Sequence, residues 1–302
     1  MIQTTTELIA GLTAGSVSTL LMHPLDVIKV KLQVSPGKGH FLSEVAKLLF
    51  KEGDANRKLQ PAQMYRGLSV NVLGNGISWG LYFMINHELL KLYSDSGSER
   101  SGNAYFSCAL LSGISTSFVT NPIWVLKTRI LSTRADQGPY STILRSFKYV
   151  YTRDGIRGFW AGFFPGLFGI AQASVQFSLY QMMRDSRLRE SRKTSNGFTE
   201  SDDGTTSIST LPTLEYLGLS ASSKIISSSI FYPYQVVRAN LQVDARTLNL
   251  QHYTSAFQVI ESILSREGLL GLYKGLGPNL LRVVPATCIT FIVYEKMKHF
   301  LE

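Results

Sequence analysis

One short stretch occurs three times in this chain, and the spacing of its copies restricts the possible folds. Each copy places a proline at the end of an apolar run and a cation five residues later. The prolines are Pro24, Pro122 and Pro233, which lie 98 and 111 residues apart. A period of about 100 residues that repeats chemistry as well as apolarity indicates three tandem units that form one body. Each proline removes a backbone hydrogen bond, so we expect a kink in the helix that carries it.

Long uncharged segments indicate a membrane protein. Four runs contain no Asp, Glu, Lys or Arg, namely residues 8–25, 67–86, 101–126 and 158–183. Two further runs contain a single charge each, Lys224 within 216–237 and Arg282 within 276–294. Every run is long enough to cross the hydrocarbon of a bilayer as a helix. The sequence therefore predicts an all-α membrane protein with six transmembrane helices, two per repeat, and disfavours a soluble protein with buried helices.

The charges between these runs alternate in sign along the chain. Residues 29–66, 127–157 and 238–274 together carry a formal charge of +11, whereas 87–100 and 184–215 carry −1 each. Because basic residues mark the side that is not translocated, the three basic connections share one compartment and both termini face the other. The net charge of +9 also fits a nucleic-acid binder. The basic residues are dispersed and form no reading motif, so we expect no nucleic-acid partner.

Each repeat is expected to hold a long helix, a short surface helix and a second long helix. The expected long helices cover about 6–34, 67–93, 103–132, 160–187, 212–242 and 275–300. The expected surface helices cover about 41–52, 141–153 and 254–266. The three repeats then occupy residues 1–95, 96–187 and 212–302, with an insertion at 54–64 and a polar, Ser-rich linker at 188–211 that we expect to be disordered.

Charged side chains inside the predicted spans are the first candidates for function. Lys224 and Arg282 each interrupt an apolar run. A charge at mid-membrane depth costs at least ~2.5–3.5 kcal/mol, so such residues face a watery cavity or pair inside the protein. Lys224 can instead extend to the membrane interface. The two cysteines, Cys108 and Cys288, also fall inside predicted spans, so we expect neither a disulfide nor a metal site.

The full repeated pattern resembles that of the mitochondrial carrier family. Its first part reads Pro-x-acid-x-x-base-x-base, as at 24–31. Its second part reads acid-Gly, four residues, aromatic-base-Gly, as at 267–275. This chain departs from it at the 54–64 insertion, at Ala161 in a basic slot, and at Trp124 and Gln235 in acidic slots. The resemblance covers essentially the whole chain. It implies a pseudo-threefold bundle of six transmembrane helices that transports by alternating access.

Further expectations follow from the same resemblance. It implies a monomer in the mitochondrial inner membrane, with its termini on the intermembrane-space side and an anionic lipid such as cardiolipin as partner. An enzyme is disfavoured, because the chain has no Gly-rich phosphate loop after a strand, no His-Glu-x-x-His motif and no convincing Ser/His/Asp set. A structural membrane protein is the other alternative, and the cost of Arg282 inside a span argues against it.

The family's pattern implies a gate at the matrix end of the odd-numbered helices. Its acidic slots are Asp26, Trp124 and Gln235, and its basic slots are Lys29, Lys127 and Arg238. We expect an Asp26–Lys127 ion pair, a cation–π contact of Trp124 with Arg238 and a hydrogen bond from Lys29 to Gln235. The family's bracing glutamines correspond to Gln33 and Gln242. Three cations and one anion predict a weakly closed, electropositive gate, unless Trp124 only packs against lipid or neighbouring side chains.

The family also implies a cytoplasmic gate and three substrate contact points. The gate positions on the even-numbered helices are Tyr180, Gln181, Arg184, Tyr294, Glu295 and Lys298. The contact points are the pairs Gly74-Asn75, Gly169-Ile170 and Arg282-Val283. In these roles Gly74 leaves room, Gly169-Ile170 forms an adenine pocket and Arg282 binds phosphate, since a guanidinium matches phosphate oxygens. Lys224 is a further candidate on the cavity face, and Asn71, Trp79 and Gln172 are possible contacts for a ring or a ribityl chain.

The substrate class follows from the two unusual gate slots. One branch of the family carries FAD, folate, NAD and pyrimidine nucleotides. The chain resembles this branch at residues 121–129, with Trp124, and at 232–238, with Gln235. The tail at 287–295 resembles the FAD and folate carriers of the branch. The resemblance therefore implies transport of FAD between cytosol and matrix, with folate, NAD or a pyrimidine nucleotide as alternatives. FAD is then the transported substrate, and no cofactor is expected.

Overall fold

All regular secondary structure in the described part of the chain is helical. The computed structural model describes residues 2–35, 41–49, 61–95, 102–133, 139–195, 212–248 and 250–301. Within these ranges the six long helices are α1 (Ile2–Val34), α3 (Leu68–Asp95), α4 (Gly102–Ser132), α6 (Phe163–Ser195), α7 (Thr213–Gln242) and α9 (Leu276–Leu301). The three short α-helices are α2 (Phe41–Leu49), α5 (Ile143–Asp154) and α8 (Ala256–Glu267). A short 3-10 helix precedes α3, α6 and α9, namely η1 (Pro61–Tyr65), η2 (Ile156–Trp160) and η3 (Leu269–Tyr273).

The element order confirms the predicted all-α class and its threefold repetition. Each repeat contains a long helix, a short helix, a 3-10 helix and a second long helix. Pro24, Pro122 and Pro233 lie inside α1, α4 and α7, which continue past them. Each short helix is amphipathic, and Thr142 and Ser255 cap the N-termini of α5 and α8 by accepting from Arg145 N and Gln258 N.

Two stretches of the described chain are long and apolar enough to cross a membrane, Tyr105–Ser132 and Leu269–Met297. The other long helices mix polar and charged residues into their apolar sequence, as α1 does with Asp26 and Lys29. Buried helices of soluble proteins can also satisfy this criterion of length and composition. The six transmembrane spans therefore remain a prediction from the sequence.

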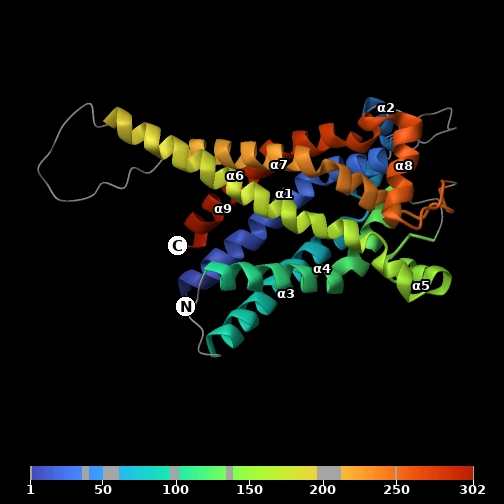
Figure 1. Ribbon diagram of the computed structural model, residues 1–302, viewed down its shortest axis with the longest axis horizontal. Helices are drawn as coiled ribbons and strands as arrows, with labels where there is room; N and C mark the ends of the chain where they lie inside the picture. The colour runs from blue at the N-terminus through green and yellow to red at the C-terminus, as the bar shows by residue number, and fades with distance from the viewer. Residues whose placement is uncertain are drawn as a thin grey trace, which may run out of the picture.

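The long helices are arranged in three pairs, and each pair joins two different repeats. The most extensive contacts are α1 with α9, α3 with α4, and α6 with α7. The α1–α9 contact connects the first repeat to the third and so closes the ring of repeats. Figure 1 shows the pairs diverging toward the end that carries both termini and converging at the end that carries α2, α5 and α8.

The convergent end holds the largest apolar core among the described residues. Val27 and Ile28 of α1, Leu131 of α4, Val150 of α5 and Phe159 of η2 are all buried in it. The divergent end has no comparable buried cluster in the described part. Burial of apolar area therefore stabilises one end of the bundle more than the other.

Glycines directly before the start of α3, α6 and α9 allow neighbouring backbones to approach closely. Gly67, Gly162 and Gly275 have φ angles of 74°, 68° and 80°, which favour glycine. A Cβ on Gly275 would lie 2.9 Å from the Tyr232 hydroxyl and 3.0 Å from the Lys29 carbonyl oxygen. The start of α9 can therefore pack against α1 and α7 only without a side chain there.

One predicted boundary is wrong. Helix α6 continues to Ser195, so residues 188–195 are helical and do not belong to the predicted linker. Arg187 forms ion pairs with Glu190 and with Glu215 of α7, and these contacts favour the helical extension. The rest of the linker, residues 196–211, and residues 54–60 of the insertion lie outside the described residues, whereas 61–64 are part of η1.

We expect Gly275→Ala to destabilise the protein by about 1–3 kcal/mol, because it adds a clash to a strained positive φ. Gly277→Ala is the matched control, since a Cβ there meets nothing within 4 Å. Thermal unfolding of both variants in detergent measures the difference. Equal unfolding temperatures for the two variants would contradict the proposed close approach at Gly275.

Candidate functional site

A cavity of about 370 Å³ lies where α1, α4, α6, α7 and α9 meet. Its wall includes five positive side chains, namely Lys29, Lys127, Lys224, Arg238 and Arg282. None of its lining residues is an Asp or a Glu. A concave site with one sign of charge concentrates ligands of the opposite sign. This cavity is therefore suited to an anion.

The floor of the cavity contains the predicted hydrogen bond between Lys29 and Gln235. The Lys29 Nζ donates to Gln235 Oε1 at 2.8 Å and also to Asn279 Oδ1 at 2.9 Å. These bonds join α1 to α7 and α9. Asn279 was not predicted, although it lies three residues before Arg282 and hence on the same helix face.

Neutral hydrogen bonds continue from Gln235 to α6. Gln235 Nε2 and the Tyr234 hydroxyl both donate to Gln172 Oε1, at 3.1 and 2.9 Å. Gln172 Nε2 in turn donates to Ser228 Oγ at 3.2 Å. Gln172, a predicted contact residue, therefore lies in the cavity wall and is already held by α7. This closure of the gate depends on amides and hydroxyls and contains no carboxylate.

The predicted Asp26–Lys127 ion pair is wrong. Asp26 forms its ion pair with Arg282 of α9, and it accepts a hydrogen bond from Asn71 Nδ2 at 3.3 Å. Helix α1 packs far more extensively against α9 than against α4, so the guanidinium is the nearer cation. Arg282 still lines the cavity, as predicted, but its charge is partly satisfied by Asp26.

Trp124 does not contact Arg238 in the predicted way. Its ring receives Lys127, whose Nζ lies 5.1 Å from the ring centroid on the same helix. The ring also packs against Gly74, where a Cβ would lie 3.5 Å from the indole and 3.1 Å from Ile123 Cγ2. The prediction that Gly74 leaves room for substrate is therefore wrong, because Ile123 and Trp124 fill that room. Asn75 hydrogen-bonds to Asn71 at 3.5 Å and is not a lining residue.

The predicted pocket at Gly169-Ile170 is also filled. A Cβ on Gly169 would lie 3.1 Å from the Tyr234 hydroxyl, so this glycine accommodates Tyr234. Ile170 packs against Gly113 of α4, where a Cβ would lie 3.2 Å from its Cδ1, and it is not among the lining residues. Gly169 lines the cavity as predicted, as does Val283.

Arg238 is a cation without a carboxylate partner among the described residues. Its guanidinium rests on Gly166, where a Cβ would lie 3.1 Å from Cζ, and Nη2 donates weakly to Asn121 Oδ1 at 3.5 Å. Its Nε has no hydrogen-bond partner in the described part of the chain. Lys224 lines the same cavity and, within the described ranges, also lacks a partner. Both side chains are therefore available to an anionic ligand.

The two predicted braces lie beneath the gate and link different helices. Gln33 Nε2 donates to the Tyr232 hydroxyl at 3.1 Å. Gln242 Oε1 accepts from Thr128 Oγ1 at 2.8 Å, which joins α7 to α4. Both glutamines also line the cavity.

The predicted cytoplasmic gate is not formed in this structure. Arg184 donates to Gln181 at 3.4 Å on its own helix. In the described ranges, Tyr180, Tyr294 and Glu295 make no hydrogen bond or ion pair to another helix, and the side chain of Lys298 lies outside the described residues. The helices diverge at this end, which separates these positions (Figure 1). Trp79 is 62% exposed, stacks on Phe83 at 5.6 Å and does not line the cavity.

The three helical repeats surround a cavity that attracts anions. Their helices converge at one end and diverge at the other, which is the architecture of a solute transporter. A family model described as mitochondrial carrier protein matches the chain three times, at residues 2–97, 98–191 and 209–302. The chain therefore belongs to the mitochondrial carrier family and is a transporter of that family.

Several curated relatives are similar to the chain over nearly its full length. A mitochondrial FAD carrier protein of Saccharomyces cerevisiae is 36% identical over 98% of this chain and 96% of that protein. A chloroplastic folate transporter of Arabidopsis thaliana is 34% identical, covering 97% and 94%. A mitochondrial nicotinamide adenine dinucleotide transporter of the same plant is 31% identical, covering 96% and 78%. These relatives are membrane transporters of organelles, and their named substrates differ.

We expect Gln235→Glu to raise the unfolding temperature and to slow transport. A carboxylate 2.8 Å from the Lys29 ammonium forms an ion pair in place of a bond to a neutral acceptor, and we expect this gain to exceed the loss of the neutral bond from Gln235 Nε2 to Gln172 by about 1 kcal/mol. Gln176→Glu is the matched control, because Gln176 lines the same cavity and has no hydrogen bond in the described part of the chain. Thermal unfolding and uptake measure the two effects. If Gln176→Glu stabilises the protein as much, Lys29 is not the relevant partner.

Proposed function

We propose that this protein transports FAD across the mitochondrial inner membrane between cytosol and matrix by alternating access. Folate, NAD and a pyrimidine nucleotide are the alternative substrates. The observation that carries the proposal is the cavity wall, with five cations and no carboxylate. A nucleotide pyrophosphate supplies the negative charge that such a wall requires.

The cations differ in how free they are to bind phosphate. Arg282 is engaged by Asp26, and Lys29 donates to two neutral acceptors. Lys127 lies over the Trp124 ring, and Lys224 and Arg238 have no partner of opposite charge among the described residues. We therefore expect phosphate oxygens to reach Lys224 and Arg238 first. They then compete with Asp26 for Arg282, which would loosen the contact between α1 and α9.

Neutral polar groups in the same cavity support a ligand with both charged and uncharged parts. Gln172, Gln176, Ser228 and Tyr234 all lie on α6 and α7 and line the cavity. They offer donors and acceptors for a ribityl chain or a ring edge, and Tyr234 offers an aromatic face. A site that binds only inorganic phosphate would not require these neutral polar and aromatic groups.

The relatives favour FAD over the alternatives and keep folate as the second candidate. The FAD carrier of yeast is 36% identical to this chain, and the plant folate transporter is 34% identical. Folate carries carboxylates, so it also suits a positive cavity. A purely structural membrane protein is disfavoured, because unpaired cations in a cavity are costly without a ligand or an ion pathway.

The membrane arrangement is part of the same proposal. The six long helices span the inner membrane, and the convergent end with α2, α5 and α8 faces the matrix. Both termini then lie on the intermembrane-space side. The three basic connections at the convergent end support this orientation. The protein acts as a monomer, with cardiolipin as an anionic lipid partner at its basic matrix side.

Uptake into liposomes that contain the purified protein tests the substrate. We expect uptake of FAD to exceed that of folate, NAD and UTP offered at the same concentration. FMN tests whether the mononucleotide is also accepted. Uptake of NAD or UTP with none of FAD would contradict the proposal.

We expect Arg238→Gln and Lys224→Gln each to weaken FAD binding about tenfold, because each removes a charge-assisted hydrogen bond to phosphate. Lys296→Gln is the control, since Lys296 is exposed on α9 and does not line the cavity. Concentration dependence of FAD uptake measures the loss. A similar loss in all three variants would indicate a general effect of net charge.

A further inference from the structure

The boundary between the second and third repeats has no gate ion pair. Its acidic slot holds Trp124, and Arg238 across from it has no carboxylate partner among the described residues. Yet α4 and α7 must stay together wherever the matrix end is closed. A second set of contacts, outside the cavity, joins the same two repeats just beyond the C-terminus of α7.

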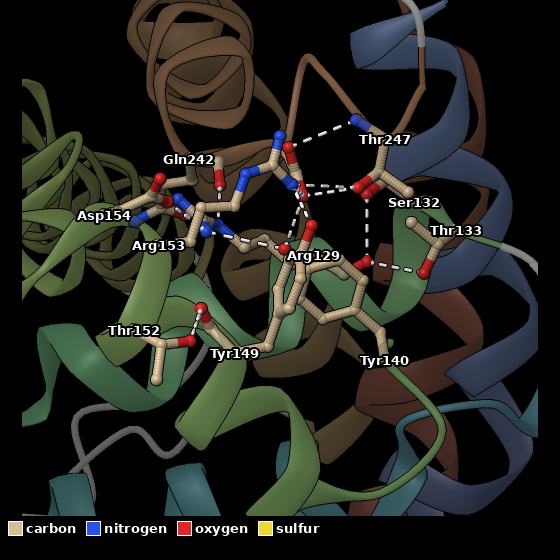
Figure 2. A network of polar contacts seen from close by, with 11 residues as sticks. Arg129, Ser132, Thr133, Tyr140, Tyr149, Thr152, Arg153, Asp154, Gln242 and Thr247 are labelled. Carbon is tan, nitrogen blue, oxygen red and sulfur yellow. Dashed lines mark hydrogen bonds and ion pairs between the residues drawn. The ribbon is translucent and has the colours of Figure 1, made fainter. Parts of the chain in front are cut away.

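Asp244 is the centre of this set. Its Oδ2 accepts from the Tyr140 hydroxyl at 2.7 Å, from Arg153 Nη1 at 3.1 Å and from Thr247 Oγ1 at 2.6 Å. Figure 2 shows Tyr140, Arg153 and Thr247 directed toward one another. Tyr140 and Arg153 belong to the second repeat, while Asp244 and Thr247 belong to the third. We call these four residues the Asp244 cluster.

The cluster is well shielded from solvent. Asp244 is 7% exposed and Tyr140 is 1% exposed. Burial alone would raise the pKa of the Asp244 carboxyl, but the hydrogen bonds from Thr247 and Tyr140 and the charge of Arg153 together hold that pKa below its usual value. Burial raises the pKa of the Tyr140 phenol, so its hydroxyl stays protonated and donates. The cluster therefore holds a charged acceptor with matched donors.

Arg129 adds a second connection across the same boundary. Its Nε donates to the Gln242 carbonyl oxygen at the C-terminus of α7, at 3.1 Å, and its Nη1 pairs with Asp154 at 2.6 Å (Figure 2). At the other boundaries Arg66 and Lys274 donate to the carbonyl oxygens of Thr133 and Ser35. The corresponding position in the second repeat is Ala161, which has no side-chain donor, and Arg129 takes over its role.

Among the described residues, the third repeat supplies an internal comparison, and it forms no such cluster with the first repeat. Tyr253 stands fourteen residues before Glu267, as Tyr140 stands fourteen before Asp154. Tyr253 hydrogen-bonds within its own repeat, to Ser262 at 2.9 Å. Arg266, the counterpart of Arg153, also binds within its own repeat, to Gln251 at 2.7 Å. Asp244 lies eleven residues after Pro233, where the other repeats have Ser35 and Thr133.

We propose that Asp244, held by Tyr140 and Arg153, is a gating residue that closes the boundary between the second and third repeats in place of the missing gate ion pair. This inference rests on the proposed alternating-access function. When the convergent end opens, α4 and α5 separate from α7, and the bonds from Tyr140 and Arg153 break. Because the cluster is outside the cavity, it sets the balance between the two states and leaves substrate preference unchanged.

A cysteine reporter in the cavity tests this proposal. Ala173→Cys lines the cavity and is introduced with Cys108→Ser and Cys288→Ser. A membrane-impermeant maleimide is then applied from the side of α2, α5 and α8 to vesicles of one orientation. We expect Tyr140→Phe and Asp244→Asn to raise the labelling rate about tenfold without substrate, since each removes a bond to a charged group. Tyr253→Phe, which removes the equivalent hydroxyl inside one repeat, should leave the rate unchanged.

The outcomes separate a gating role from a purely structural one. If Tyr140→Phe and Asp244→Asn lower the unfolding temperature but label no faster than Tyr253→Phe, the cluster only stabilises the fold and the proposal is wrong. The ratio of FAD to folate uptake should be unaffected in both variants, and a changed ratio would also contradict the proposal. The proposed function is tested separately, by whether FAD raises the labelling of the otherwise unmodified reporter protein.

Discussion

Five positive side chains share the wall of one cavity, and no carboxylate lines that wall with them. Like charges at such short range repel strongly where the dielectric constant is low, so this arrangement persists only with water and an anion close by. Asp26, the acidic residue of the predicted gate, forms an ion pair with Arg282 at the edge of the cavity. The charge of the cavity therefore determines the class of ligand, whereas the geometry of the helical bundle alone does not.

The way in which the convergent end closes follows from the same shortage of acids. Beneath the cavity the closure consists of hydrogen bonds to neutral amides, from Lys29 to Gln235 and on to Gln172. Such bonds contribute about 1–3 kcal/mol each, so they hold the gate without making it permanent. Among the described residues, the boundary between the second and third repeats has no ion pair in the cavity, only neutral hydrogen bonds such as those from Gln235 to Gln172 and from Thr128 to Gln242. The charged contacts of this boundary lie further out, between the buried Asp244 and its partners Tyr140 and Arg153.

Much of the fold could be predicted from the sequence, whereas the site could be predicted only in part. The spacing of Pro24, Pro122 and Pro233 predicted the repeats, and the gate slots predicted the bond between Lys29 and Gln235. A local sequence pattern does not show which helices pack most closely. The pairing of Asp26 with Arg282 and the filling of the space at Gly74 were therefore not predicted. Asp244 did carry a signal, since the other repeats have an uncharged residue at its position.

Binding of riboflavin, FMN and FAD to the purified protein tests the central claim most directly. These ligands share one ring system, and they carry zero, one and two phosphate groups. If the cavity cations recognise phosphate, affinity rises along this series, and the advantage of FAD over riboflavin shrinks as the salt concentration increases. Riboflavin that binds as tightly as FAD, at every salt concentration, would contradict the account.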